Sequence, residues 1–288
     1  MNKIALILEG GGFRGLYTSG VLDKMMEERI DIPYVVGVSM GACNGSAYIS
    51  EQIGRNKKVN IEYIHDPKYM SFKRLLFKKE LFGMDYIFDY IPNNLDVFNF
   101  EAYDRSHKNF KMVVTNMLTG KAEYLTAKNN NKKLMAILQA SASLPLISRE
   151  VMIEGTPYLD GGITDPIPFE HALMEGCEKV IVVLTRPRDY IKTPERALPL
   201  IQKRYKNFPL FCEAFALRHE KYNAAREKLF LLEQEGKALI LAPKVPLEAK
   251  RIEREKEKLY ADYDTGYQDC ANKLEEIRAF LFSGKVSL

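Results

Sequence analysis

A serine lies between two glycines in the pentapeptide GVSMG at residues 37–41, directly after the β-branched run YVVGV and before the helical pattern of residues 42–53. A sharp strand-to-helix turn exposes a serine hydroxyl and leaves the next amide free at the helix N-terminus. This context indicates Ser39 as an acyl-transfer nucleophile, with Gly37 and Gly41 as the small neighbours that such a turn requires. Close packing of strand against helix would also explain both glycines.

A second glycine-rich segment, GGGFRG at residues 10–15, also lies between a strand-like run and a helical pattern. Successive backbone N–H groups in such a turn form a nest that binds anions. In acyl transfer the anion is the oxyanion of the tetrahedral intermediate. The predicted oxyanion-hole residues are Gly10, Gly11, Gly12, Arg14, Gly15 and Met40. For Arg14, a role at the loop and a plain surface ion pair are equally open.

The same glycines satisfy the dinucleotide pattern GxGxxG, through Gly10, Gly12 and Gly15. A dinucleotide fold needs an acidic residue at the end of its second strand to bind the ribose. Here that strand runs into Ser39 and carries no acid. The oxyanion hole is therefore favoured, and a nucleotide-binding regulatory module remains the alternative from a different functional class.

A serine nucleophile needs a base, and the sequence offers two. Asp160 ends a short apolar run in YLDGGITDPIP, although an Asp-Gly-Gly turn would also explain it. His171 would complete the order Ser-Asp-His, but it falls within an apparently regular helix, PFEHALMEG. No feature marks His65, His107 or His219 as catalytic. The residues alone thus favour a dyad with Asp160 as proton acceptor over a triad with His171.

The order of the motifs GGGxRG, GxSxG and DGG resembles that of the patatin-like phospholipase family, over about residues 4–175. The segment ASASLP at residues 140–145 is also similar. This resemblance implies Ser39 as nucleophile, Asp160 as proton acceptor and the loop of residues 10–15 as oxyanion hole. It further implies a lipid acyl hydrolase that cleaves carboxylic esters through an acyl-serine, without a metal or other cofactor. A general carboxylesterase, thioesterase or acyltransferase for soluble acyl groups is the alternative.

The elements that must position these residues alternate along the first half of the chain. Apolar runs at residues 4–8, 34–38, 111–116 and 179–185 predict strands, and helical patterns lie at residues 17–25, 131–141 and 168–175. Such alternation predicts an α/β fold with a mostly parallel central sheet flanked by helices, the three-layer patatin-like arrangement that the resemblance implies.

Two segments depart from this rhythm. Residues 54–110 predict a helical insertion over the sheet. The extension of residues 195–288 predicts a helix ending near Gly236, a strand at 238–243 and a second helix from about residue 247 to 282. That strand has buried composition, so we expect it to join the same sheet and make residues 1–288 one domain. The interleaved charges of KRIEREKEK at 250–258 predict a solvated helix face without a function.

Composition limits the partners that we expect. The 42 basic and 38 acidic residues nearly balance, which disfavours nucleic acid, and no apolar run is long enough to cross a membrane. The four cysteines show no metal-ligand or disulfide spacing, which fits the cytoplasm. Residues 70–82 combine apolar and basic side chains, as in an interfacial helix at the inner face of the membrane or a lid; core packing is the alternative. Those side chains are Phe72, Lys73, Arg74, Leu75, Leu76, Phe77, Lys78 and Lys79.

Overall fold

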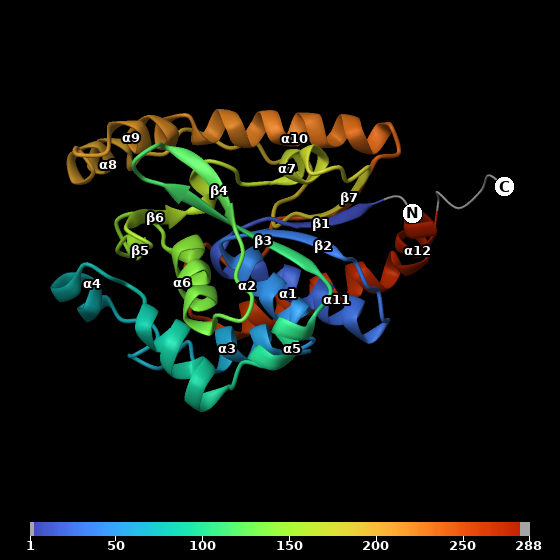
Figure 1. Ribbon diagram of the computed structural model, residues 1–288, viewed down its shortest axis with the longest axis horizontal. Helices are drawn as coiled ribbons and strands as arrows, with labels where there is room; N and C mark the ends of the chain where they lie inside the picture. The colour runs from blue at the N-terminus through green and yellow to red at the C-terminus, as the bar shows by residue number, and fades with distance from the viewer. Residues whose placement is uncertain (1–2, 283–288) are drawn as a thin grey trace.

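The computed structural model describes residues 3–282 of the 288-residue chain. A central sheet carries helices on both faces, so that the fold has three layers (Figure 1). The strand order is β5-β6-β3-β2-β1-β7-β8, and β4 also pairs with β3. The strands are β1 (Ile4–Leu8), β2 (Tyr34–Val38), β3 (Asn109–Asn116), β4 (Lys121–Leu125), β5 (Val151–Ile153), β6 (Thr156–Asp160), β7 (Lys179–Val183) and β8 (Ala238–Leu241). The predicted three-layer α/β fold is confirmed.

Parallel pairing joins β3, β2, β1, β7 and β8, whereas β4, β5 and β6 are antiparallel to their neighbours. The chain changes direction across the sheet at β1, which pairs with β2 on one side and β7 on the other. Leu8 is in register with Gly37 and with Val183, so the segments after these three strands emerge at one edge. Ligands of open α/β sheets bind at such a switch point, outside the carboxyl ends of the strands.

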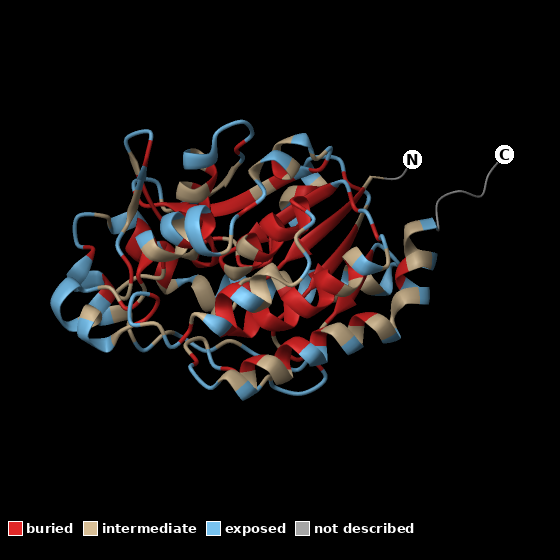
Figure 2. Cartoon of the chain, turned by 90° about the horizontal axis from the view of Figure 1, so that it is seen from below, coloured by how far each residue is buried: buried red, intermediate tan, exposed pale blue. Residues whose placement is uncertain are grey.

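The central strands are buried on both faces, which explains their continuous apolar sequences (Figure 2). In β1, Ile4, Leu6 and Leu8 pack on one side, and Ala5 and Ile7 on the other. The first side is covered chiefly by α1 (Gly15–Glu27), α2 (Met40–Ile49), α6 (Asn131–Ala142) and α11 (Lys256–Asn272), and the second by α7 (Phe169–Met174) and α10 (Arg218–Gln234) (Figure 1).

The helices of the described chain fall into three groups by position. Those near the first strands are α1 (Gly15–Glu27), α2 (Met40–Ile49), α6 (Asn131–Ala142) and α7 (Phe169–Met174), with the short 3₁₀ turns η1 (Gly12–Arg14) and η3 (Gly161–Ile163). The segment between β2 and β3 contains α3 (Arg55–Glu62), α4 (Phe72–Lys78), the π-helix η2 (Tyr86–Leu95) and α5 (Phe100–Arg105). The C-terminal helices are α8 (Leu198–Arg204), α9 (Pro209–Ala216), α10 (Arg218–Gln234), α11 (Lys256–Asn272) and α12 (Leu274–Phe282).

Most of the segment of residues 54–110 lies against helices, whereas Phe98 and Tyr103 join the buried cluster on the sheet, so its predicted position over the sheet holds only for its last part. Its helices α3 and η2 contact α1, α6 and α11 (Figure 1). Val59 and Ile61 of α3 share a buried cluster with Phe13, Leu16 and Leu259. The physical reason is that α1 and α2 already cover this part of the sheet, so that α3 and η2 pack on helices instead.

The C-terminal extension contains the predicted strand, because β8 pairs in parallel with β7. The long helix predicted from residue 247 was wrong in its first part, since α11 begins at Lys256. Residues 247–255 form a loop whose amides at Glu248 and Ala249 donate to the buried carboxylate of Asp262, at 2.9 and 3.0 Å. The loop is also tied to the N-terminal region, because the amide of Phe13 donates to the carbonyl of Arg251 at 3.3 Å.

Within residues 3–282, no helix has both the length and the apolar character that a membrane span requires.

Candidate active site

Ser39 occupies the turn between β2 and α2, with φ 57° and ψ −126°. A non-glycine residue at positive φ is strained and persists only where its surroundings hold it. Close backbone packing holds this turn. A Cβ on Gly41 would lie 2.3 Å from the carbonyl oxygen of Leu8, and one on Gly37 would lie 2.6 Å from that of Gly41. Both flanking positions therefore exclude any larger residue, as the sharp turn predicted from GVSMG requires.

A second serine fixes the backbone of this turn. The amide of Ser39 donates to Oγ of Ser141 at 2.8 Å, and that hydroxyl donates to the carbonyl of Val113 at 2.6 Å. Ser141 is fully buried on α6. The segment of residues 140–145 is conspicuous in the sequence, but Ser141 had no predicted role, because a helical serine alone does not indicate which amide it binds.

Asp160 ends β6, and its Oδ2 accepts a hydrogen bond from the Ser39 hydroxyl at 2.7 Å. The pairing of β6 with β3 places Asp160 beside Val114, next to the edge where β2 ends. Its other oxygen, Oδ1, accepts the amide of Gly162 at 2.8 Å. Burial raises the pKa of Asp160, and the hydrogen bond from Ser39 and the nearby Arg218 guanidinium partly oppose that rise. The carboxylate is thus a buried, oriented acceptor for the serine proton.

The glycine loop after β1 passes directly beside the turn, because a Cβ on Gly10 would lie 2.9 Å from Cβ of Ser39. Gly11 and Gly12 line the same cavity as Ser39 and Asp160, and neither amide donates to another residue in the described part of the chain. Met40 is the first residue of α2, where an amide has no preceding helical carbonyl to bond. The loop is suited to bind an oxyanion, and that role remains a proposal.

Arg14 is buried beside this loop, with 7% of its surface exposed. It forms no hydrogen bond or ion pair with any residue in 3–282, and its Nε is buried without a partner. Burial lowers the pKa of Arg14 to about 10, with a further contribution from the charge of Arg186. The open alternative of a surface ion pair is therefore wrong. Gly15, which follows, lets α1 approach α2, since its Cβ would lie 2.3 Å from Cγ of Met40.

The histidines lie elsewhere. His171 stacks on Tyr124, with ring centroids 3.5 Å apart, and lines neither cavity at Ser39. Burial lowers the pKa of His171. The contacts of the other three are to the carbonyl of Arg254 for His65, to Asp31 for His107 and to the carbonyl of Ala216 for His219. The Ser-Asp-His triad is thus not assembled here.

An apolar cavity of about 110 Å³ opens on one side of Ser39. Its walls come from α2, α6 and the segment of residues 54–98, including Tyr69, Phe82, Phe88, Phe98, Met135 and Leu138. A long acyl group needs walls of this composition.

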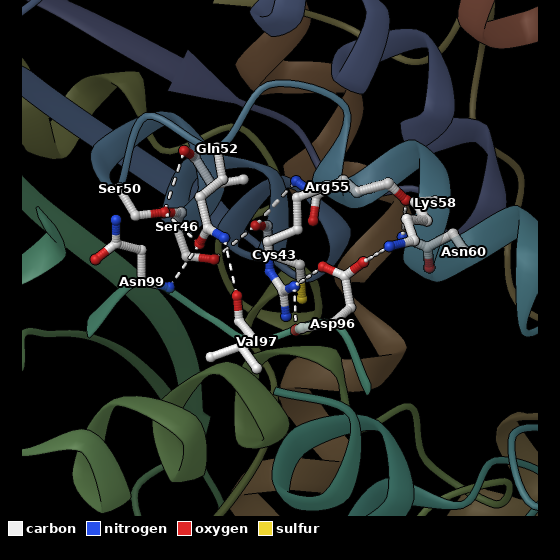
Figure 3. Close-up of polar contacts among 12 residues, drawn as sticks. Cys43, Ser46, Ser50, Gln52, Arg55, Lys58, Asn60, Asp96, Val97 and Asn99 are labelled. Carbon is white, nitrogen blue, oxygen red and sulfur yellow. Dashed lines mark hydrogen bonds and ion pairs between the residues drawn. The ribbon is translucent and has the colours of Figure 1, made fainter. Parts of the chain in front are cut away.

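Polar contacts attach the segment of residues 96–99 to α3 and to the turn before it (Figure 3). Asp96 pairs with Arg55 and with Lys58, the latter at 2.7 Å. Gln52 donates to the carbonyl of Val97 at 3.0 Å. Since Arg55 lines the apolar cavity and its guanidinium lies 5.3 Å from the ring centroid of Phe98, this network secures one wall.

A polar cavity of about 50 Å³ opens on the other side of Ser39. Most of its charged lining could not be found from the sequence, because those residues belong to no motif. Arg251 even lies in the stretch predicted to be a solvated helix face, which is wrong at residues 250–255 because they form the loop before α11. The missed cations are Arg186, Lys192, Arg218 and Arg251.

Comparisons with known proteins identify related sequences and a similar fold. A family model described as patatin-like phospholipase matches residues 6–173, and one described as a domain of unknown function, DUF6363, matches residues 208–282. The protein YjjU of Escherichia coli is 32% identical over 199 residues, covering 67% of this chain and 55% of that protein. Lysophospholipase nte1 of Aspergillus terreus is 26% identical over 200 residues, covering 63% of this chain but 12% of the other.

The fold is also similar to that of VipD from Legionella pneumophila, with a TM-score of 0.54 and 14% identity over 96% of this chain and 67% of that one. The chain spans about half the length of YjjU and a small part of nte1. Because the first family model matches more than half of the residues and includes both Ser39 and Asp160, this chain belongs to the patatin-like phospholipase family.

Proposed function

We propose that this protein is a lipid acyl hydrolase that cleaves carboxylic esters through Ser39 and Asp160. The observation that carries the proposal is the 2.7 Å hydrogen bond from the strained, buried serine to the buried carboxylate, at the junction of an apolar and a polar cavity. An ester of a fatty acid has the same division into an apolar acyl part and a polar alcohol.

In the proposed mechanism Asp160 takes the proton of Ser39 as Oγ attacks the acyl carbon. The amides of Gly11, Gly12 and Met40 stabilise the oxyanion of the tetrahedral intermediate, which is commonly the largest single contribution to such catalysis. The intermediate collapses to an acyl-serine, and Asp160 returns the proton to the departing alkoxide. Asp160 then accepts a proton from water as water attacks the acyl-serine, and it returns this proton to Oγ of Ser39 as the bond to the acyl group breaks and the fatty acid leaves.

Hydrolysis of p-nitrophenyl esters tests this function. We expect wild-type turnover to increase from acetate to longer acyl chains, because the apolar cavity binds them. Ser39→Ala should lower kcat by at least about 10³-fold. Ser143→Ala is the matched control, a buried serine whose hydroxyl bonds the carbonyl of Gln139. Equal turnover by Ser39→Ala and wild type would contradict the proposal, and a preference for acetate would favour an esterase for soluble substrates.

A peripheral membrane contact through α4 is a second part of the proposal. Phe72, Leu76 and Phe77 expose 62%, 76% and 80% of their surface, and no residue of α4 is buried, so the alternative of core packing does not apply to them. Lys73, Lys78 and Lys79 are exposed beside them and form no ion pair in the described structure. Exposed aromatic and basic side chains together suit anionic lipid surfaces.

The position of α4 supports this contact. An antiparallel bridge between Met70 and Phe82 joins the segments before and after α4. Phe82 and Tyr69, the residue before Met70, line the apolar cavity. A helix inserted at a lipid surface would therefore lie next to the proposed acyl site.

A further inference from the structure

The polar cavity beside the dyad has an unusual concentration of cations. Residues of the described chain that line it include Arg14, Arg186, Lys192, Arg218 and Arg251. All but Arg14 follow residue 173, where the patatin-like match ends. The C-terminal part of the chain, including Arg218 and Arg251 in the stretch matched by the domain of unknown function, thus completes a chamber next to the catalytic serine.

The carboxylates around this chamber do not neutralise it. Glu195 is shared by three cations: Lys192 at 3.1 Å, Arg218 at 2.9 Å and Arg251 at 3.6 Å. Glu9 accepts from the hydroxyl of Tyr222 at 2.7 Å and from the backbone and side chain of Thr185. With Asp160, and with Asp262 whose charge acts on Arg14, four carboxylates lie around the five cations in the described chain, which leaves one positive charge in excess.

Two of the cations form no hydrogen bond or ion pair with a carboxylate of residues 3–282. Arg14 is more than nine-tenths buried and donates to no described residue, although its guanidinium lines the chamber. The guanidinium of Arg186 lies 4.4 Å from the ring centroid of Tyr190 and pairs with no carboxylate in residues 3–282. Leaving the buried Nε of Arg14 unsatisfied is costly, and guanidinium groups bind phosphate oxygens in a bidentate manner. The local excess of positive charge also acts on Lys192, because burial and the charge of the nearby Arg218 lower the pKa of Lys192 to about 8.

We propose that this chamber binds a phosphate monoester on the alcohol side of the ester substrate, so that the protein acts on acylglycerol phosphates in preference to neutral or choline-bearing lipids. This inference rests on the proposed function, with the acyl chain in the apolar cavity and the phosphorylated alcohol as leaving group. The negative charge of a phosphate monoester suits this excess of cations. A quaternary ammonium head group does not, because the rings of Tyr190 and Tyr222 already lie next to the cations Arg186 and Lys192.

The test compares one acyl chain on three alcohols: 1-decanoylglycerol, its 3-phosphate and the corresponding phosphocholine. We expect wild-type kcat/KM for the phosphate to exceed that for the neutral ester by at least about tenfold, the scale of one charge-assisted contact. Arg186→Gln/Lys192→Met should reduce this ratio to near one. Arg188→Gln is the matched control, an arginine of the same loop that pairs with Glu233 outside the chamber, and should leave the ratio unchanged.

Calorimetry separates this inference from the proposed function, because it needs no turnover. In the Ser39→Ala background, decanoylglycerol 3-phosphate should bind at least about tenfold more tightly than decanoylglycerol, and Arg186→Gln/Lys192→Met should remove the difference. Equal binding of the two lipids overturns the phosphate chamber even if wild type cleaves both. If wild type cleaves neither lipid but Ser39→Ala still binds the phosphate more tightly, the proposed hydrolase function is overturned and the phosphate-binding chamber is supported. If inorganic phosphate displaces decanoylglycerol and decanoylglycerol 3-phosphate equally well, the chamber binds free phosphate. That result would overturn its proposed role in binding the substrate's phosphate.

Discussion

At the scale of single residues, Ser39 and Asp160 could be singled out because each lies in a short motif at the end of a strand. Ser39 and Asp160 were both identified from their flanking glycines, and their side chains are hydrogen bonded in the structure. Ser141 and Arg218 could not be identified, because their contacts join elements far apart in the chain and leave no local pattern.

The buried carboxylate gives a residue-scale prediction about stability. Burial raises the pKa of Asp160, so the folded state binds its proton more tightly than the unfolded state does. Wild-type stability should therefore fall as pH rises from the unfolded pKa, about 3.9, through the raised folded value. Asp160→Asn cannot ionise and should therefore melt at a higher temperature than wild type near pH 8. Each kcal/mol gained in the free energy of unfolding raises Tm by about 2–4 °C.

Thermal melts of wild type and Asp160→Asn across the pH range test whether the variant has the higher Tm near pH 8. The difference in Tm should shrink as the pH is lowered towards 4, where wild-type Asp160 becomes protonated. At the same time Asp160→Asn should lose about 10²–10⁴-fold in kcat, because the proton acceptor is absent. A lower Tm for Asp160→Asn than for wild type near pH 8 would show that the ionised carboxylate stabilises the fold, which contradicts this prediction.

At the scale of elements, the turn that contains Ser39 depends on α6. Ser141→Ala would leave the buried amide of Ser39 without an acceptor, at a cost of about 1–3 kcal/mol, and would loosen the strained turn. We expect a lower Tm together with a lower kcat. Ser143→Ala is the matched control, since that hydroxyl bonds only the carbonyl of Gln139 one turn earlier in the chain. Chemical denaturation and ester turnover measure both effects, and equal kcat in the two variants would argue against a positioning role for Ser141.

The glycine loop gives a second prediction at this scale. Gly12 has φ 59°, and a Cβ there would lie 2.2 Å from the carbonyl oxygen of Arg251. Gly155 has φ 83° with open space around it. Alanine at either position incurs the strain of positive φ, about 1 kcal/mol, but only Gly12→Ala must also displace the loop of residues 247–255. Gly12→Ala should be the less stable of the two and lose most ester turnover. Similar melting and turnover for both variants would contradict the close packing.

Secondary structure followed the sequence where the hydrophobic period was regular, as in β1, α1 and β8. It failed at residues 247–255, where the charge pattern of a helix face is overridden by the hydrogen bonds that two backbone amides donate to the carboxylate of Asp262 on α11. The strands β4 and β5 were also missed, because they are short and mostly not fully buried and so lack an apolar run.

At the scale of the whole molecule, the exposed face of α4 predicts binding to lipid. Phe72→Ser/Leu76→Ser/Phe77→Ser should reduce sedimentation with vesicles of phosphatidylglycerol and phosphatidylcholine, while turnover of a soluble short-chain ester stays the same. The contact loses about 25 cal/mol for each Å² of apolar surface that no longer inserts. Leu118→Ser, an exposed leucine in the turn between β3 and β4, is the control. Unchanged sedimentation of the triple variant would exclude α4 as the lipid contact.

The fold class and the order of the central elements were predictable, since a βαβ pattern admits few arrangements. The placement of α3 and η2 against helices could not be predicted, because whether a segment covers a sheet or its helices depends on which surfaces earlier elements have already buried. The single-domain organisation of residues 1–288 remains a prediction, as does the cytoplasmic location.

The central claim is that Asp160 activates Ser39, and covalent labelling with a fluorophosphonate, followed by intact-mass spectrometry, tests it most directly. We predict one adduct on wild type at Ser39, none on Ser39→Ala, and labelling of Asp160→Asn slowed by at least about 10²-fold while its fold is retained. Labelling of Ser39→Ala to the wild-type extent, or of Asp160→Asn at the wild-type rate, would contradict the account.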